Sequence, residues 1–174
     1  KEVFEHADNL DAIATATTGL NHIDTEAAAD HGVEVICLRG EREFLNSIYA
    51  TAEHAWALLL ACIRNLPAAT THVVEGGWNR DQFKGHEVHD ATLGVLGYGR
   101  LGSKVAKYGD AFGMDVMAHD PNVSNGKYAT FVGFDELLQR ADYLSIHVPY
   151  NESTEKLIGT SELALMKEGS YLVN

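Results

Sequence analysis

The sequence predicts an α/β protein built on a doubly wound parallel sheet. From Thr92 onward, short apolar segments that suit strands alternate with amphipathic segments that suit helices, and the links between them are short. A glycine-rich turn separates the first of these strands from the helix that follows, and Asp120 ends the second strand. The 174 residues, 45% apolar and 22% charged, are typical of a folded protein and give room for one domain and part of a second.

The first 45 residues predict a smaller β-α-β unit. Residues 11–20 alternate small and apolar side chains, as a buried strand and its loop do. A short helix follows, with Asp24 or Thr25 as its N-cap and Gly32 as its end, and residues 33–38 form the next strand. Such a unit pairs its strands in parallel through a right-handed crossover. We interpret residues 1–45 as a partial domain and residues 46–174 as a second domain, incomplete at its C-terminus.

A long helix is expected where these two parts meet. The polar segment 39–45 ("RGEREFL") breaks the strand pattern, and a helix follows from about Ser47 to Leu66, where Pro67 ends it. This helix is rich in Ala and Leu nearly all round, so we expect it to be buried on more than one side, as between two domains. A loop over residues 73–91 then leads to Thr92.

The remaining elements alternate regularly. Leu101, Val105, Tyr108 and Phe112 lie at helical spacing on one face, and Gly113 ends their helix. The segments that follow predict a strand over 114–120, a helix over 134–142, a strand over 143–149, a helix over 161–169 and a strand over 170–174. This order is that of a parallel sheet with helices on both faces.

The turn "GYGRLG" over residues 97–102 is the motif that carries chemistry. A nucleoside-triphosphate loop requires a Lys followed by Ser or Thr, but here Ser103 precedes Lys104. The remaining interpretation is G-x-G-x-x-G between a strand and a helix, with an acid about 20 residues on, which is the dinucleotide-binding fingerprint.

Each residue of this fingerprint has a physical role. Gly97 allows the tight turn, Gly99 lets a pyrophosphate approach the backbone, and Gly102 lets the helix pack on its strand. Asp120 accepts hydrogen bonds from the hydroxyls of the adenosine ribose. Because its carboxylate would repel a 2′-phosphate, the predicted cofactor is NAD rather than NADP.

Charge and composition argue against several other classes of function. A net charge of −12 is unsuited to a nucleic acid or an anionic membrane, and the longest apolar stretch, Ala55 to Ile63, is too short to cross a bilayer. Cys37 and Cys62 stand too far apart for a zinc site or a disulfide framework, so we expect a cytoplasmic location. His86 and His89 lie in a predicted loop rather than on a helix, and we predict no metal site.

The chain resembles the D-isomer-specific 2-hydroxyacid dehydrogenase family. The resemblance is carried, in the family's order and over nearly the whole chain, by TTGLNHID, TAEHAWALLLACIRNLP, GGWNRDQFKGHEV, LGVLGYGRLGSKVA, HDP, LSIHVPYNESTEKLI and LMKEGSYLVN. It implies a Rossmann fold for residues 46–174, begun by an interdomain helix, and a remnant of a flavodoxin-like substrate domain in residues 1–45. It also implies NAD as cofactor, a D-2-hydroxy or 2-oxo acid as substrate, and a homodimer for the full-length protein.

The resemblance also assigns site residues by motif. Those implied in cofactor binding are Gly97, Tyr98, Gly99, Arg100, Leu101, Gly102, Asp120, Pro121, His147, Val148, Pro149, Thr154 and Thr51. Tyr98 is given only a backbone role. Thr18, Gly19 and Leu20 correspond to the loop that faces the nicotinamide and the substrate carboxylate. Arg39 or Arg42, where most members carry a Pro/Asn-rich link, takes part in substrate choice or belongs to a solvated loop.

The resemblance places the family's catalytic groups outside this chain. Its Arg, Glu and His follow the position of Asn174, and a start at Lys1 rather than Met leads us to expect a piece of a longer protein. Two functions remain open: an NAD-dependent oxidoreductase whose catalytic half lies elsewhere, or a dinucleotide-binding sensor or corepressor-like module without chemistry. The sequence after Asn174 distinguishes them, because Arg-Gly followed by Glu and His indicates the enzyme.

Overall fold

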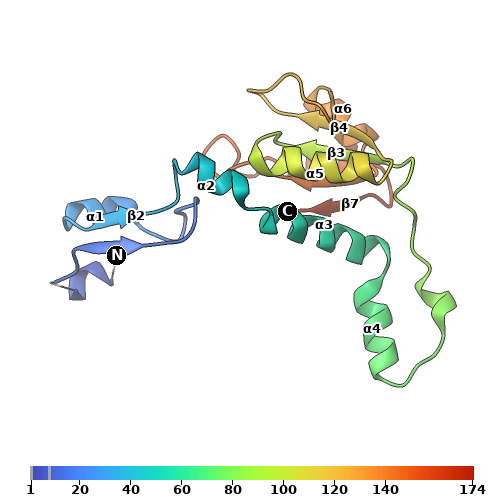
Figure 1. The fold of residues 1–174 in the computed structure, drawn as a ribbon, viewed down its shortest axis with the longest axis horizontal. Helices are drawn as coiled ribbons and strands as arrows, with labels where there is room; N and C mark the ends of the chain where they lie inside the picture. Colours follow the sequence, from blue (N-terminus) through green and yellow to red (C-terminus); the bar gives the residue numbers. More distant parts are fainter. Residues whose placement is uncertain (1, 8) are drawn as a thin grey trace. The chain divides into compact units, whose positions relative to one another are not determined.

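The computed structural model describes residues 2–7 and 9–174, so Lys1, where we expected a cut in a longer chain, lies outside the described residues. The chain divides into two compact units. The small unit holds the residues up to Ile48 together with Pro149–Glu155, and the large unit holds Tyr49–Val148 with Lys156–Asn174. Figure 1 shows the elements of both in sequence colours.

The small unit contains the predicted β-α-β arrangement. Its elements are the 3-10 helix η1 (Phe4–His6), β1 (Ala12–Ala14), α1 (Thr25–Asp30), β2 (Glu34–Ile36) and α2 (Arg42–Ser47). The two strands pair in parallel. Asp24 caps α1, because its carboxylate accepts a hydrogen bond from the Ala27 N–H at 2.9 Å. The strands are shorter than the alternating segments that predicted them.

The large unit is built on a five-stranded parallel sheet, which confirms the predicted fold class. In the sheet the strands run in the order β5 (Thr130–Phe131), β4 (Asp115–His119), β3 (Thr92–Leu96), β6 (Tyr143–Ile146) and β7 (Tyr171–Val173). The chain runs outward from β3 in one direction and then returns to β3's other side at β6. The gap between the carboxyl ends of β3 and β6 is therefore the topological switch point, where ligands of such sheets bind.

Helices cover both faces of this sheet (Figure 1). On one face, α3 (Ala50–Ile63) packs on α5 (Arg100–Ala111); on the other lie α6 (Phe134–Arg140) and α7 (Thr160–Leu165). Side chains of a strand alternate between the faces. Accordingly Leu93 and Val95 join the core under α3 and α5, while Leu96 joins the core under α6. Each fully buried side chain of this size contributes roughly 1.5–3 kcal/mol.

The predicted long helix from Ser47 to Leu66 is wrong in its extent. The structure has α2, α3 and α4 (Leu66–Val74) in its place, with a break at Asn65, which adopts a left-handed φ of 52°. Pro67 lies in the first turn of α4, where its missing N–H costs no hydrogen bond, so it begins a helix instead of ending one.

Three other segments also differ from the prediction. Segment 39–45, expected as a loop, contains the start of α2 at Arg42. The expected loop over residues 73–91 contains the end of α4 and the 3-10 helix η2 (Arg80–Phe83). The two-residue strand β5 was not expected, since its pairing with β4 is the main feature that identifies it.

Among the described residues, no single helix is both long and apolar enough to cross a membrane. Only the segment 42–63, which contains α2 and α3, taken together with α4 has the required length and composition, and the two are bent by 68°.

Asp142, directly before β6, connects β3 and the turn before β7 at the amino ends of the sheet. One carboxylate oxygen accepts a hydrogen bond from the Thr92 N–H at 2.8 Å, and the other accepts one from Lys167 Nζ at 2.8 Å. Burial alone would raise the pKa of Asp142, but the hydrogen bonds from Lys167 and Thr92 and the charge of Lys167 hold that pKa below its usual value. The charged carboxylate therefore belongs to the folded state.

We expect Asp142→Ala to lower the free energy of unfolding by about 1–3 kcal/mol, because the half-buried Thr92 N–H loses its acceptor. A carboxyl group whose pKa is lowered on folding stabilises the protein above its unfolded-state pKa, and this contribution is lost as the pH falls through the folded-state value. The deficit of the variant, measured by urea unfolding, should therefore be present at neutral pH and shrink in acid. Asp115→Ala, at the exposed start of β4, is the control. If Asp142→Ala lowered the free energy of unfolding equally at all pH values, the charged Asp142 carboxylate would not be the stabilising group.

Candidate functional site

The candidate site lies at the carboxyl ends of β3, β4 and β6. The backbone N–H of Gly97 donates to the carbonyl oxygen of His119 at 2.8 Å, and the N–H of His147 donates to the carbonyl oxygen of Leu96 at 2.7 Å. These bonds hold the ends of the three strands together at the switch point. The glycine-rich turn, Asp120 and His147 follow directly on β3, β4 and β6, so this edge brings together the residues that the motifs predicted.

Two of the glycines in the turn are required by the fold. Gly97 has a φ of 89°, and a Cβ there would come within 2.8 Å of the carbonyl oxygen of His147. A Cβ at Gly102 would overlap the carbonyl oxygen of Gly97 and lie 3.1 Å from the side chain of Val95, so Gly102 lets α5 pack on β3. Both observations agree with the roles expected from the sequence.

Neither the backbone conformation nor the packing of the protein requires a glycine at position 99. Its φ of −80° suits any residue, and a Cβ there would meet no protein atom within 4 Å. Gly99 is the N-cap of α5, and no side chain caps this helix and no acid stands in its first turn. The N–H groups of the first helical turn and the positive end of the helix dipole favour an anion at this point. Open space beside an uncapped helix end fits the pyrophosphate of a dinucleotide.

Asp120 is held against the glycine-rich turn. Its Oδ2 accepts a hydrogen bond from the N–H of Tyr98, and its Oδ1 accepts one from the N–H of Asn122, each at 2.8 Å. A carboxylate oxygen can accept more than one hydrogen bond, so both oxygens retain capacity for ribose hydroxyls. Pro121, the next residue, is exposed.

His147 lies at the end of β6 with a neutral ring. Burial lowers the pKa of His147 to about 4, so the imidazole is uncharged near neutral pH. Its Nε2 lies 2.8 Å from the hydroxyl of Ser145, which is itself buried. Ser145 was not expected at the site, because its only signal in the sequence is a hydroxyl within an otherwise apolar strand. Val148, the next residue along, is half-buried.

The other residues expected at the site are described with the unit to which each belongs. In the small unit, Thr18, Gly19 and Leu20 follow β1, and the Thr154 hydroxyl donates to the carbonyl oxygen of Pro149. In the large unit, Thr51 is exposed near the start of α3, and Arg100 and Leu101 begin α5. Their roles in cofactor and substrate binding remain predictions.

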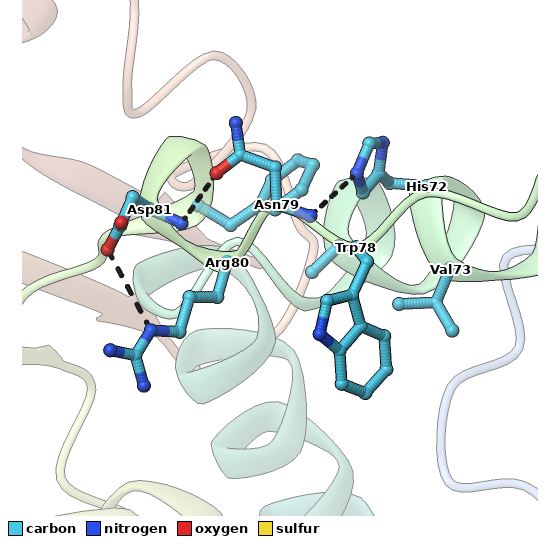
Figure 2. Close-up of a pocket in the computed structure, with 8 residues that line it drawn as sticks. His72, Val73, Trp78, Asn79, Arg80 and Asp81 are labelled. Atoms are coloured by element: carbon cyan, nitrogen blue, oxygen red, sulfur yellow. Dashed lines mark hydrogen bonds and ion pairs between the residues drawn. The ribbon is translucent and has the colours of Figure 1, made fainter.

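A cavity of about 530 Å³ lies elsewhere in the large unit, in the arm formed by residues 64–87 (Figure 2). Its lining is mixed: Val73, Trp78 and Phe83 are apolar or aromatic, whereas Asn79, Arg80 and Asp81 are polar or charged. The ring of His72 packs on Phe83, and its Nε2 accepts a hydrogen bond from the N–H of Asn79. No group of three or more metal-ligating side chains occurs within residues 2–7 and 9–174.

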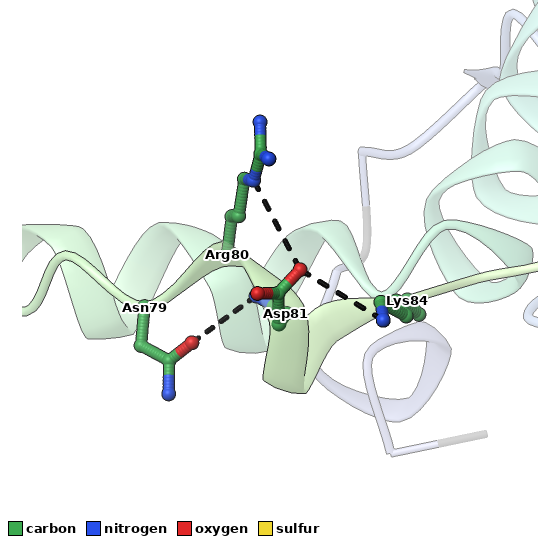
Figure 3. Close-up of polar contacts among 4 residues, drawn as sticks. All are labelled: Asn79, Arg80, Asp81 and Lys84. Atoms are coloured by element: carbon green, nitrogen blue, oxygen red, sulfur yellow. Dashed lines mark hydrogen bonds and ion pairs between the residues drawn. The ribbon is translucent and has the colours of Figure 1, made fainter.

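The arm also carries exposed charges of both signs. Figure 3 shows Asp81 between Arg80, whose Nε lies 3.9 Å from its carboxylate, and Lys84, whose Nζ lies 3.8 Å away. All three side chains are well exposed, so these pairs contribute little to stability. The side chain of Asn65 and the N–H of His86 close the base of the arm through hydrogen bonds to Lys84 and Ile63, respectively.

The chain is similar to known dehydrogenases in sequence. Residues 56–174 match the family described as D-isomer specific 2-hydroxyacid dehydrogenase, NAD binding domain. The D-3-phosphoglycerate dehydrogenase of Methanocaldococcus jannaschii is 37% identical over 180 residues, which cover 100% of this chain and 33% of that protein.

Two solved structures share the fold. The NAD-dependent formate dehydrogenase of Staphylococcus aureus in complex with NAD is 36% identical with a TM-score of 0.83, covering 98% of this chain and 51% of that one. An acyclic imino acid reductase (Bsp5) in complex with NADPH and D-Arg is 31% identical with a TM-score of 0.77, covering 98% and 54%. The chain thus spans between a third and about half of the proteins that it matches.

Proposed function

Because the chain belongs to the D-isomer specific 2-hydroxyacid dehydrogenase family, we propose that it is the NAD-binding part of an oxidoreductase. The reaction would move a hydride between nicotinamide and the CH–OH carbon of a D-2-hydroxy acid. The observation that carries the proposal is the open position at Gly99, which lies beside the uncapped start of α5. When bound, the nicotinamide supplies the hydride donor or acceptor.

Different residues at the switch point would bind different parts of the dinucleotide. The N–H groups of Arg100 and Leu101 would hold the pyrophosphate at the helix end, and Asp120 would accept the ribose hydroxyls. His147 and Val148 would line the cofactor, with the imidazole neutral and hydrogen-bonded to Ser145. We further propose that Thr51, Pro149 and Thr154 contact the cofactor, and that Thr18, Gly19 and Leu20 face the substrate, as the family's motifs imply.

The proton chemistry would come from a longer protein that contains this chain. The family's catalytic Arg, Glu and His are expected after Asn174, so residues 1–174 would hold the cofactor without completing the reaction. General acid–base catalysis contributes roughly 10²–10⁴-fold to such reactions, and loss of substrate positioning can cost as much again.

We expect purified chain 1–174 to bind NADH and to show no steady turnover with hydroxypyruvate, glyoxylate or pyruvate. The protein extended beyond Asn174 should reduce at least one of these acids, followed by absorbance at the NADH band. In both proteins Gly99→Val should abolish NADH binding, because its side chain fills the open position. Gly133→Val, at the equally open N-cap of α6, should bind normally. Binding by the Gly99 variant within a few fold of the parent chain would contradict the proposal.

We propose that the cofactor is NAD rather than NADP. The half-buried Asp120 would repel a 2′-phosphate about 4 Å away by roughly 1–4 kcal/mol, between the limits of water and of a partly screened site. The residues that follow, "PNVSNG", offer no positive side chain before Lys127.

NADH should therefore bind at least about fivefold more tightly than NADPH. Asp120→Asn should narrow this ratio while retaining an acceptor for the Tyr98 N–H. Fluorescence titration of both cofactors measures the ratio. Asp110→Asn, on the exposed side of α5, should leave it unchanged. Equal affinities in the parent chain would refute the assignment.

We propose that the full-length protein is a homodimer in which the arm of residues 64–87 contacts the partner. Within the described part of the chain, these residues add nothing to the apolar clusters that form the cores. The arm exposes 94% of Trp78 and 81% of Val74. Such an apolar surface marks an interaction site, and a twofold dimer would place the same surface on both sides of the contact. A second copy also suits the mixed charges of Asp81 and Lys84, since each can face its opposite.

Trp78→Ser should convert the dimer to a monomer, because it removes the largest exposed apolar side chain of the arm. Light scattering on the chain and on the longer protein measures the mass. Phe44→Ser, at an exposed position on α2, is the matched control and should remain dimeric. The proposal would be overturned if the longer protein without substitutions were a monomer, or if its Trp78→Ser variant kept the mass of the unsubstituted protein.

We also propose a cytoplasmic location. Cys37 and Cys62 are free thiols, and Cys62 is exposed, as suits a reducing compartment. Cell fractionation with an antibody to the chain tests this, and recovery in a secreted or periplasmic fraction would refute it.

A further inference from the structure

We propose that the side chain of Tyr98 is a positioning residue that holds the loop after β4, residues 121–129, against the glycine-rich turn and thereby sets the adenosine-ribose end of the site. Tyr98 occupies a variable position of the G-x-G-x-x-G motif, where only the backbone was expected to act. The inference rests on the proposed dinucleotide function.

The ring of Tyr98 is fixed by packing. Only 8% of the residue is exposed, and the ring meets Phe131 of β5 edge to face, with centroids 5.0 Å apart. Gly126, in the middle of the loop, lies so close that a Cβ there would overlap the Tyr98 ring. The loop therefore passes directly over the ring, and a glycine at position 126 allows it to do so.

The hydroxyl of Tyr98 holds the far end of the same loop. It accepts a hydrogen bond from the N–H of Tyr128 at 3.3 Å. Without this acceptor the half-buried N–H would lose its partner, which is more costly than the mean strength of a hydrogen bond suggests. One side chain thus contacts the middle and the end of the loop.

The backbone of Tyr98 holds the near end. Its N–H donates to Oδ2 of Asp120, while Oδ1 accepts from the N–H of Asn122, the second residue after Asp120. Hydrogen bonds therefore connect Asp120 to Tyr98 and Tyr98 to Tyr128, and the loop itself joins Tyr128 to Asp120. The orientation of the carboxylate that would read the ribose is therefore coupled to the Tyr98 side chain.

The test uses the purified chain and Tyr98→Phe, which keeps the ring and removes only the hydroxyl. We expect the Kd for ADP-ribose and for NADH to rise about threefold to tenfold, the size of one lost hydrogen bond. The Kd for reduced nicotinamide mononucleotide should stay the same, and the preference for NADH over NADPH should narrow. A merely structural role would not separate the two halves of the cofactor in this way.

Tyr143→Phe is the matched control, because Tyr143 is 5% exposed and lies in β6, whose start is at the amino end of the sheet. It should leave all four affinities unchanged at a similar melting temperature. The inference would be overturned if Tyr98→Phe bound ADP-ribose within twofold of the affinity of the unsubstituted chain. It would also be overturned if Tyr143→Phe lost as much affinity for ADP-ribose as Tyr98→Phe. Because Gly99→Val tests the dinucleotide site itself, that outcome would leave the proposed function standing. A parent chain that binds no NADH would refute both.

Discussion

The site depends on the absence of a side chain at Gly97. At this residue the chain leaves the central strand, turns with a positive φ, and passes against the carbonyl group of His147, which directly follows the neighbouring strand β6. The same residue donates its N–H to His119 on the other neighbouring strand. A Cβ would push the chain apart where the carboxyl ends of β3 and β6 form the candidate site. The turn at Gly97 also imposes a constraint on Gly102. Gly102 must approach the carbonyl oxygen of Gly97 for α5 to lie on the sheet, which leaves no room for a Cβ.

The two faces of β3 extend this constraint through the large unit. Leu93 and Val95 anchor the helices on one face, and Leu96 anchors those on the other. A Cβ at Gly94 would come within 2.9 Å of the Ala141 side chain, so α6 also approaches the strand closely. With the central strand packed this tightly on both sides, the start of α5 has little freedom to move. The helix end that would meet the pyrophosphate is therefore held in place before any ligand arrives.

The sequence allowed the sheet and the glycine-rich turn to be predicted because their signals are local. Short apolar runs identify the buried strands of the sheet, and the spacing of Gly97, Gly99 and Gly102 identifies the turn between strand and helix. Pro67 was misread because a proline both ends helices and begins them, and the break depends on the backbone of Asn65. The contacts of Tyr98 with Tyr128 and Gly126 were beyond reach, since they join residues about thirty positions apart through a loop without a motif. The buried hydroxyl of Ser145 acquires meaning only beside His147.

The arm, residues 64–87, lies outside the apolar cores, and this affects where the chain unfolds locally. In the arm α4 contacts η2, and hydrogen bonds close its base, but none of its described residues belongs to the apolar clusters around the sheet. Regions with few buried apolar contacts unfold locally at a lower free energy than the core. We therefore expect amide protons along α4 and η2 to exchange with solvent by local unfolding that leaves the hydrogen bonds of β3 intact. In an assembly that covers the arm, the same protons would become protected, so their exchange rate reports association independently of anything bound at the glycine-rich turn.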